Sequence, residues 1–218
     1  MAWRLGVDSG GTFCDVCLYN ADTKQFSIWK VSSTPDDPSR GILAGVTDGL
    51  GTVSAGPPDV SCLGNGTTVG TNAVIQHKGA LTCLITTDGF RDLLEIGRQQ
   101  RPSLYDTQAD KSETLVARAL RFEVPERIRH DGTVETVLDE ESVREAARSL
   151  KKAGVKAVAI GFLYAFVNPA HEKRALEIVQ EEFPEAFSCA SHQVAPEFRE
   201  YERLSTTVVN AYLGPVME

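Results

Sequence analysis

The chain has 218 residues, of which 42% are hydrophobic and 24% are charged, a length and composition typical of a globular protein with one large domain or two small ones. Its formal net charge of -8, from 22 basic and 30 acidic residues, excludes the basic footprint of a nucleic-acid-binding protein. No apolar run is long enough to span a bilayer, and the first residues lead directly into a strand rather than a signal region. We therefore expect a cytoplasmic protein that binds neither nucleic acid nor membranes.

Five cysteines are spread along the chain, and this odd number does not indicate a disulfide framework. Cys14 and Cys17 form a CxxC pair, but the residues around them alternate in hydrophobicity as in a strand. Residues three apart in a strand face opposite sides, so this pair is not expected to share a metal ion. Four scattered histidines show no metal-ligand spacing, and we interpret each as an ordinary surface or loop residue: His77, His130, His171 and His192.

The chain opens with three strands joined by short turns, at residues 4–7, 13–19 and 26–31. Adjacent strands with such short connections predict an antiparallel meander. The period then changes to that of a helix, and Pro35-Asp36-Asp37-Pro38 favours a helix start. The apolar face of this helix is expected to consist of Ile42, Leu43, Val46 and Leu50.

Strands and helices alternate in the middle of the chain. In order, we expect a strand at 60–63, a turn at 64–66, a helix at 67–77, a strand at 80–86 and a short helix at 90–95. Residues 97–115 lack clear periodicity. An irregular loop of this length inside a compact domain is more often functional than neutral.

The alternation continues to the end of the sequence. In order, we expect a hairpin-like pair at 119–128 and 133–137, a helix that Asp139 caps and that runs to Ala153, a strand at 157–162, a helix at 169–183, a strand at 187–190, and a helix that begins at Pro196, reaches Tyr212 and is stopped by Gly214-Pro215. A run of strands followed by alternating helices and strands predicts an α/β fold.

The first motif that suits a ligand is Asp8-Ser9-Gly10-Gly11-Thr12, between two strands. Adjacent glycines allow positive φ and successive inward N–H groups, which together form a concavity for phosphate oxygens. Thr12 would add a hydroxyl donor, and Asp8 suits Mg²⁺, directly or through water. The simpler interpretation is a plain hairpin turn, because Gly-Gly is common there. No Gly-Lys-Ser/Thr follows, so the motif is not a Walker A loop.

The second motif, Gly64 to Asn72, follows a strand and opens a helix. It is similar to a dinucleotide fingerprint, but one residue too many separates its second and third glycines, which disfavours NAD binding. The glycines and the hydroxyls of Thr67 and Thr68 still suit an anion or a polar ligand at a helix start. The simpler interpretation is a capped helix, with Thr67 or Thr68 as the N-cap.

The third motif, Arg199 to Tyr212, combines charged residues with an apolar helical stripe. The stripe consists of Phe198, Tyr201, Leu204, Val208 and Tyr212. Without further knowledge, a surface helix with ion pairs four residues apart is the favoured interpretation. No Gly-x-Ser-x-Gly elbow occurs, so no local sign of a serine hydrolase is present.

These motifs, in this order, resemble the hydantoinase A/5-oxoprolinase family, which also includes a subunit of acetone carboxylase. The matching stretches cover nearly the whole chain, at residues 7–16, 66–73, 86–98, 168–172 and 199–212. Each stretch is weak by itself, whereas the ordered set is specific.

The resemblance implies an α/β fold like that of the actin/hexokinase/Hsp70 ATPases, a ribonuclease H-like lobe that starts with the antiparallel meander and is joined by a second α/β segment. Residues 1–190 would form the hydantoinase/oxoprolinase N-terminal region, and 191–218 a helix that leads into a catalytic lobe absent from this sequence. That later lobe would carry the adenine site and the second phosphate loop. We therefore expect this chain by itself neither to hydrolyse ATP nor to bind it tightly.

In the related ATPases the first β-hairpin cradles nucleotide phosphates, and the resemblance implies the same role here. It assigns the phosphates of ATP to Gly10, Gly11, Thr12, Thr67 and Thr68. It makes Asp8 the expected catalytic carboxylate, and Asp8 and Asp15 the expected Mg²⁺ ligands. We place the substrate near Asn72, Arg98 and Arg101. The two arginines suit a carboxylate, and their simpler interpretation is surface charge.

The implied chemistry is ATP-driven opening of a cyclic amide, such as hydantoin, N-methylhydantoin or 5-oxoproline, by a homo- or hetero-oligomer with a second subunit of the hydantoinase B type as a candidate partner. Two residues depart from the family pattern, which commonly has His at position 65 and Thr at position 14. Asn65 cannot titrate, and Cys14 donates only weakly. Two alternatives therefore stay open: a ketone carboxylase subunit, and a non-catalytic binding or assembly module that retains the fold.

Overall fold

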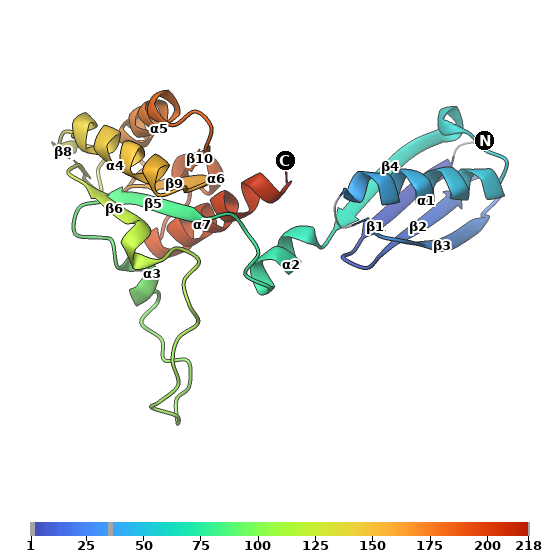
Figure 1. Cartoon of the computed structure of the whole chain (residues 1–218), viewed down its shortest axis with the longest axis horizontal. Coiled ribbons are helices and arrows are strands. Elements are labelled where there is room, and N and C mark those ends of the chain that lie inside the picture. Colours follow the sequence, from blue (N-terminus) through green and yellow to red (C-terminus); the bar gives the residue numbers. More distant parts are fainter. Residues whose placement is uncertain (1–2, 35–36, 218) are drawn as a thin grey trace. The chain divides into compact units, whose positions relative to one another are not determined.

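The computed structural model describes residues 3–34 and 37–217. The chain forms two compact units, Met1–Lys78 and Gly79–Glu218, which are considered separately here (Figure 1). The boundary expected near residue 190 lies inside the second unit and stays a prediction, whereas the division after Lys78 was not expected from the sequence. No helix in the described part of the chain is long and apolar enough to cross a bilayer.

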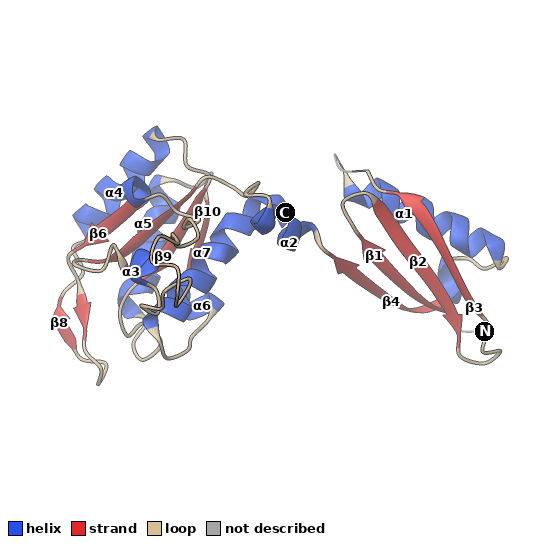
Figure 2. Cartoon of the chain, turned by 90° about the horizontal axis from the view of Figure 1, so that it is seen from below, coloured by secondary structure: helices blue, strands red, loops and turns tan. Residues whose placement is uncertain are grey.

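The first unit is a four-stranded sheet with the strand order β3-β2-β1-β4. Its strands are β1 Trp3–Ser9, β2 Phe13–Asn20, β3 Phe26–Ser32 and β4 Val60–Thr67. The first three pair antiparallel, which confirms the predicted meander, and β4 pairs parallel to β1. Two helices complete the unit: α1 Pro38–Thr52, which covers one face of the sheet, and α2 Val69–Ile75 (Figure 2).

The predicted turn at residues 64–66 is wrong. β4 continues through both glycines to Thr67, because Gly64 and Gly66 pair with Gly6 and Asp8 in the parallel ladder. The helix after it is correspondingly shorter than the 67–77 expected. A turn and a strand that contains glycines look alike in sequence, and pairing with a distant strand decides between them.

Ile42, Val46 and Leu50 of the predicted apolar face pack against the sheet, and three glycines bring α1 close to it. Gly41, Gly45 and Gly49 recur every four residues and are buried, whereas Leu43 of the predicted apolar face is 64% exposed. The Trp29 ring lies against Gly49, and its Nε1 donates to the Gly45 carbonyl at 2.6 Å. A side chain at Gly49 would displace the ring, and a Cβ at Gly45 would lie 2.9 Å from Val16 Cγ2, so the close contact between helix and sheet requires their absence.

The second unit is a parallel four-stranded sheet with the order β10-β9-β5-β6. Its strands are β5 Thr82–Thr87, β6 Arg121–Val124, β9 Ala157–Gly161 and β10 Phe187–Ala190. α4 Glu140–Lys152 and α5 Ala170–Glu182 share one core with the sheet, and α3 Leu93–Ile96 and α7 Glu200–Met217 share the other (Figure 1). The first unit also contains the short 3-10 helix η1 Pro57–Asp59. The second unit also contains the 3-10 helix η2 Arg118–Leu120, the hairpin of β7 Arg127–Ile128 with β8 Val134–Thr136, and α6 Ser191–Val194.

Two expectations for the second unit need correction. Residues 119–128 do not form one arm of a hairpin, because β6 joins β5 in parallel and only β7 pairs with β8. α7 begins at Glu200 rather than Pro196, and it runs through Gly214-Pro215 instead of stopping there. A Cβ at Gly214 would lie 2.5 Å from the Phe187 ring, so this glycine permits close packing rather than ending the helix.

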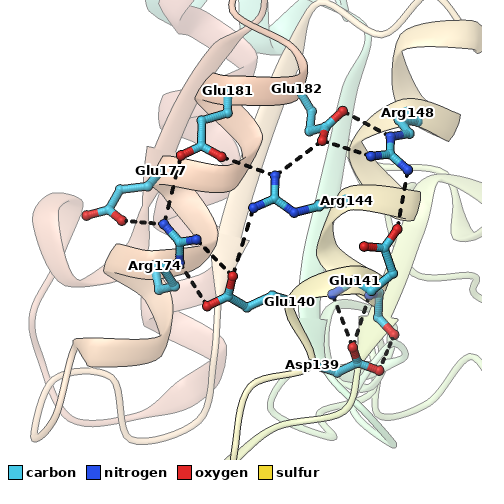
Figure 3. A network of polar contacts seen from close by, with 10 residues as sticks. Asp139, Glu140, Glu141, Arg144, Arg148, Arg174, Glu177, Glu181 and Glu182 are labelled. Atoms are coloured by element: carbon cyan, nitrogen blue, oxygen red, sulfur yellow. Dashed lines mark hydrogen bonds and ion pairs between the residues drawn. The ribbon is translucent and has the colours of Figure 1, made fainter.

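A network of ion pairs joins α4 to α5 on the outer surface (Figure 3). Arg144 reaches Glu181 at 3.1 Å and Glu182 at 3.2 Å, and Arg174 reaches Glu140 at 2.8 Å. A single ion pair between side chains this exposed contributes little to stability, whereas a network of shared pairs fixes the orientation of the two helices relative to each other. Asp139 caps α4 as predicted, accepting from the Ser142 hydroxyl and backbone amides.

The glycine face of α1 generates a stability prediction. A Cβ at Gly49 would lie 1.3 Å from Cζ2 of Trp29, whereas a Cβ at Gly51 meets nothing within 4 Å. Gly49→Ala should therefore lower the free energy of unfolding by about 1–3 kcal/mol through overpacking. Gly51→Ala should be neutral or stabilise by up to about 1 kcal/mol. Urea denaturation followed by Trp fluorescence measures both, and equal effects of the two variants would contradict this packing.

The Asp139 cap generates a pH prediction. The Ser142 hydroxyl and then backbone N–H groups lower the pKa of Asp139. A carboxylate with a lowered pKa stabilises the fold above its unfolded pKa of about 4, and this stabilisation disappears as the pH falls through the folded value. Asp139→Ala should thus lower the urea midpoint at pH 7, and the difference from the unchanged chain should shrink below pH 4. Asp139→Asn, which caps without titrating, should keep its midpoint at pH 7 close to that of the unchanged chain.

Candidate functional site

The turn between β1 and β2 is closed by a hydrogen bond from the Gly10 amide to the Phe13 carbonyl at 3.0 Å. Neither Gly10 nor Gly11 has a positive φ, so that part of the sequence expectation is wrong. The need for glycine at position 10 comes instead from close approach, because a Cβ there would lie 3.0 Å from the Phe13 oxygen. The Gly10 N–H is therefore already hydrogen-bonded within the turn and is not available to a ligand.

The next two amides of the turn remain available. Gly11 and Thr12 are exposed, and their N–H groups have no hydrogen-bond acceptor among residues 3–34 and 37–217. The Ser33 amide donates to the Thr12 carbonyl at 2.9 Å and so holds the far side of the turn. Two adjacent unpaired N–H groups at a fixed turn suit an anionic oxygen.

Two carboxylates lie beside this turn on the sheet face that α1 does not cover. Asp8 and Asp15 are directly opposite in the β1–β2 ladder, so their side chains share that face. Lys30, opposite Asp15 on β3, forms an ion pair with it at 3.0 Å, and its ammonium lies 5.2 Å from the Phe13 ring centre. Asp8 has no polar partner among the described residues.

The fit of Mg²⁺ to these carboxylates follows from the same geometry. Asp8 is exposed, and Gly66 leaves space beside it, since a Cβ at Gly66 would lie 3.8 Å from Asp8 Oδ1. Asp15 would have to exchange Lys30 for the metal. In the described part of the chain, no group of three or more His, Cys, Asp or Glu residues suits a metal. A cation held by Asp8 would therefore need phosphate and water oxygens to complete its shell.

The end of β4 reaches the same edge of the sheet. Thr68 donates its amide to the Ser9 carbonyl at 3.2 Å, and the Thr67 hydroxyl donates to the same carbonyl at 3.2 Å. The Thr67 hydroxyl thus joins two strand ends rather than facing outward. The Thr68 oxygen accepts from Asn72 Nδ2 at 3.2 Å, which leaves the Thr68 O–H able to donate. A Cβ at Gly11 would lie 3.7 Å from that Asn72 nitrogen, so Asn72 borders the turn.

The structure thus brings eight of the residues expected from the sequence to one edge of the first unit: Asp8, Gly10, Gly11, Thr12, Asp15, Thr67, Thr68 and Asn72. Arg98 and Arg101 belong to the second unit. The Arg98 guanidinium binds Glu202, with Nε 2.6 Å from Oε1, and Arg101 is exposed. The carboxylate-binding role expected of both stays a prediction.

The two departures from the family pattern lie away from the open edge. Cys14 is fully buried, and its thiol donates to the Ser9 hydroxyl at 3.5 Å. Asn65 pairs with Val7, so its side chain lies on the sheet face opposite Asp8. Neither residue therefore alters the amides of the turn.

Buried charges in the second unit were not expected from the sequence. Glu172 is fully buried and accepts from the amides of Phe162 and His192, from the Ser191 hydroxyl and from the His192 ring. The guanidinium of Arg203, 1% exposed, donates to Ser191 and to backbone carbonyls. These contacts join the stretches 168–172 and 199–203, and the second belongs to the helix that the sequence pattern assigned to a surface.

A second buried pair corrects the interpretation of the histidines. His171 is 8% exposed, and its Nδ1 lies 2.8 Å from Oε2 of the buried Glu126. Thr87 hydrogen-bonds the other oxygen of Glu126 and accepts from the Leu163 amide. These groups connect the carboxyl ends of β5 and β9, so His171 is not an ordinary surface residue. The charged character of the Asn168–Glu172 stretch was the available signal.

Comparison with known proteins identifies relatives over nearly the whole chain. The caprolactamase subunit alpha of Pseudomonas jessenii is 42% identical over 222 residues, covering 99% of this chain and 32% of its own length. Its crystal structure, described as that of an ATP-dependent caprolactamase, matches with a TM-score of 0.85. A nucleotide-free acetone carboxylase structure matches with a TM-score of 0.89 at 29% identity, over 97% of this chain and 32% of that one. A 5-oxoprolinase of Saccharomyces cerevisiae is 30% identical over 99% of this chain and 20% of its own length.

The chain spans about a third of the caprolactamase subunit and about a fifth of the 5-oxoprolinase. Residues 4–183 match the family described as the hydantoinase/oxoprolinase N-terminal region. That match covers most of the chain and includes the turn at Asp8–Thr12 and the end of β4. The chain therefore belongs to the hydantoinase/oxoprolinase family.

Proposed function

We propose that this chain supplies the first phosphate-binding turn of an enzyme that uses ATP to open cyclic amides. One observation carries the proposal: the unpaired amides of Gly11 and Thr12 lie beside the exposed, unpartnered carboxylate of Asp8. The two amides would donate to phosphate oxygens and the carboxylate would hold Mg²⁺, and together these groups make up half of a nucleotide site. The ATP-dependent caprolactamase, whose subunit is 42% identical, supports the assignment.

The reaction would proceed by activation of the amide oxygen. A lactam or ureide carbonyl is a poor electrophile, so transfer of the γ-phosphoryl group to its oxygen converts that oxygen into a leaving group. ADP is released by this transfer, water then adds to the carbon, and the C–N bond opens with the ring nitrogen leaving as an amine. A second water displaces phosphate from the resulting acyl phosphate and gives the ring-opened acid. The protein's part is positioning and charge stabilisation. Gly11, Thr12 and Thr68 would donate to phosphate oxygens, and Asp8 would hold Mg²⁺.

The proposal also covers the oligomeric state and the cellular compartment. Relatives of this chain are named as subunits of caprolactamase, acetone carboxylase and acetophenone carboxylase. We therefore infer that the chain works in an oligomer with a second subunit of the hydantoinase B type, in the cytoplasm, where ATP is available.

A ketone carboxylase is the second candidate function. The acetone carboxylase match, at a TM-score of 0.89, supports it directly. The same turn would serve there, because both reactions use ATP to activate a carbonyl compound. A non-catalytic module is less well supported, since Cys14 is buried behind the turn and Asn65 lies on the sheet face opposite Asp8, so both leave the amides of Gly11 and Thr12 free.

Turnover assays of the longer protein with its second subunit test the proposal. ATP hydrolysis would be measured with hydantoin, N-methylhydantoin, 5-oxoproline, caprolactam, and acetone plus bicarbonate. We expect stimulation by at least one cyclic amide, with the ring-opened acid formed in equal amount to ADP. Stimulation by acetone and bicarbonate alone would establish the carboxylase instead, and none with any substrate would reject both.

A substitution of Asp8, with a matched control substitution at Asp22, tests the metal-binding role in this assay. Asp8→Asn removes the metal-binding charge while keeping the shape, and we expect ATP turnover to fall by about 10²-fold or more. Asp22→Asn makes the same change in the exposed turn between β2 and β3, away from the site, and should have no effect. Equal turnover by both variants would remove Asp8 from the mechanism.

The 218-residue chain should bind ATP only weakly by itself. The turn offers two unpaired amides and one carboxylate, and nothing in the described residues marks an adenine site. Calorimetry with Mg·ATP should give a dissociation constant above about 1 mM, corresponding to about -4 kcal/mol or weaker. Micromolar affinity would show that the chain holds a complete nucleotide site.

A further inference from the structure

A pocket of about 640 Å³ lies in the second unit, between α3, the irregular segment 97–115 and α7. Its volume falls in the range of small-molecule sites. Figure 1 shows the irregular segment as a long green loop that extends away from α3. The pocket lies where the two ends of this segment meet the helices, so its lining combines residues that are about a hundred positions apart in sequence.

Contacts at both ends of the irregular segment hold it against the walls of the pocket. At one end, Arg98 Nε binds Glu202 Oε1 on α7 at 2.6 Å. At the other end, Lys111 Nζ donates to the carbonyls of Glu95 and Ile96 on α3 at 3.1 and 3.0 Å. The two ends of the segment are thereby fixed to different walls, the first to α7 and the second to α3.

Four charged side chains line the pocket, and the fold has already paired two of them. Glu95 forms an ion pair with Arg121 at 2.8 Å, and Arg98 is paired with α7 as described above. The other two, Lys111 and Glu113, form no ion pair with each other or with any residue among 3–34 and 37–217. One positive and one negative charge in the lining are therefore open to a ligand.

The Lys111 ammonium has one N–H group left for a ligand. An ammonium carries three donors, and two of them bind the carbonyls of α3. The Tyr201 hydroxyl also lines the pocket, and it has no hydrogen-bond partner in the described part of the chain. A carboxylate accepts from both kinds of donor, and the charged donor makes the stronger hydrogen bond. The lining therefore provides the groups that bind one carboxylate.

The Glu113 carboxylate determines what else the ligand carries. Glu113 is two residues from Lys111 and lines the same pocket. Its carboxylate only accepts hydrogen bonds, so a ligand with a carboxylate alone would add a second negative charge that nothing compensates. An ammonium group on the ligand supplies the opposite charge together with donors. The two open charges thus match a zwitterion rather than an anion or a cation.

The apolar part of the lining comes from other elements than the open charges. Leu94 lies on α3, and Val208 and Val209 lie on α7, whereas both open charges belong to the irregular segment. A ligand that fits this lining has both charged groups at one end and a hydrocarbon group at the other, which is the arrangement of an α-amino acid with an aliphatic side chain. A molecule with its charges at opposite ends would place one of them on the aliphatic surface, which is unfavourable.

We propose that this pocket binds an α-amino acid with an aliphatic side chain in its zwitterionic form. The carboxylate binds Lys111 and Tyr201, the ammonium binds Glu113, and the side chain packs against α3 and α7. Because the bound ligand contacts the irregular segment and both helices, it holds the segment to them. The site shares no residue with the turn of the first unit, and binding there requires neither ATP nor the reaction of the proposed function.

NMR titration of the chain with a set of six-carbon probes tests the proposal. L-Norleucine has the proposed arrangement of groups, hexanoate and hexylamine each lack one of its charges, and 6-aminohexanoate carries both charges at opposite ends. Norleucine should bind at least about tenfold more tightly than each of the others, since a hydrogen bond to a charged group is worth about this factor. Equal or tighter binding of any other probe, or no binding of norleucine, would overturn the proposal.

Glu113→Gln isolates the contact with the ligand ammonium. Glu113 is exposed and has no partner among the described residues, so the substitution should leave the fold unchanged. It should weaken norleucine binding by about tenfold, whereas hexanoate, which makes no such contact, should bind as before or more tightly. Glu145→Gln makes the same substitution on the exposed side of α4, outside the pocket, and should change neither affinity. If both variants weaken norleucine equally, net charge rather than the pocket is responsible and the proposal fails.

Lys111→Gln isolates the contact with the ligand carboxylate. Gln keeps an N–H donor for the carbonyls of α3 but removes the charge. Norleucine and hexanoate should both bind about tenfold more weakly to this variant, whereas hexylamine, which has no carboxylate, should not. The urea midpoint of the variant, which should stay close to that of the unchanged chain, shows that the fold is intact. Unchanged norleucine affinity in Lys111→Gln would place the carboxylate elsewhere and reject the site.

Discussion

Parallel pairing of β1 with β4 is the contact on which the candidate site depends. It places the end of β4 beside the end of β1, so that Thr67 and Thr68 both bond to the Ser9 carbonyl across 58 residues of sequence. α2 starts from this point and brings Asn72 to the turn. Without the pairing, the turn at Gly10–Gly11 would be an isolated hairpin connection. With it, two unpaired amides, a carboxylate and a threonine hydroxyl share one sheet edge.

The second unit depends on buried charges in the same way. Glu172 is surrounded by four donors, and Arg203 spans from Ser191 to the carbonyl of Phe162. Removing one of these partners would leave a buried polar atom unsatisfied, at a cost of about 1–3 kcal/mol. This network joins α5, α6 and α7 to the ends of β9 and β10. It assigns a structural role to Arg203, which lies in a helix that the sequence alone suggested was at a surface.

Pairing of charges also limits what each open site can bind. At the first turn Asp8 is unpaired and the amides are free, which favours phosphate with a cation. In the second unit Arg98, the residue expected to hold a carboxylate, is already bound to Glu202. The fold has thus already neutralised this guanidinium, whereas it leaves the Asp8 carboxylate open.

The sequence by itself determined the elements with strong local signals. The meander, the Asp139 cap, the helices α4 and α5 and the irregular segment 97–115 were all predictable, because alternation, capping and helical period act over a few residues. The phosphate turn was predictable as a candidate from its glycines and neighbouring acid. The family resemblance extended this to Thr67, Thr68 and Asn72.

Only the tertiary structure decided the rest. Gly64 and Gly66 lie in a strand because β1 pairs with them, and Gly214 lies within a helix because Phe187 packs against it. Gly49 and Gly45 of α1 face the sheet because Trp29 and the valines Val16 and Val31 occupy the space their side chains would fill. Gly10 closes the turn without positive φ, and His171 is buried because Glu126 pairs with it. In each case the deciding partner is distant in sequence, and local propensity carries no information about it.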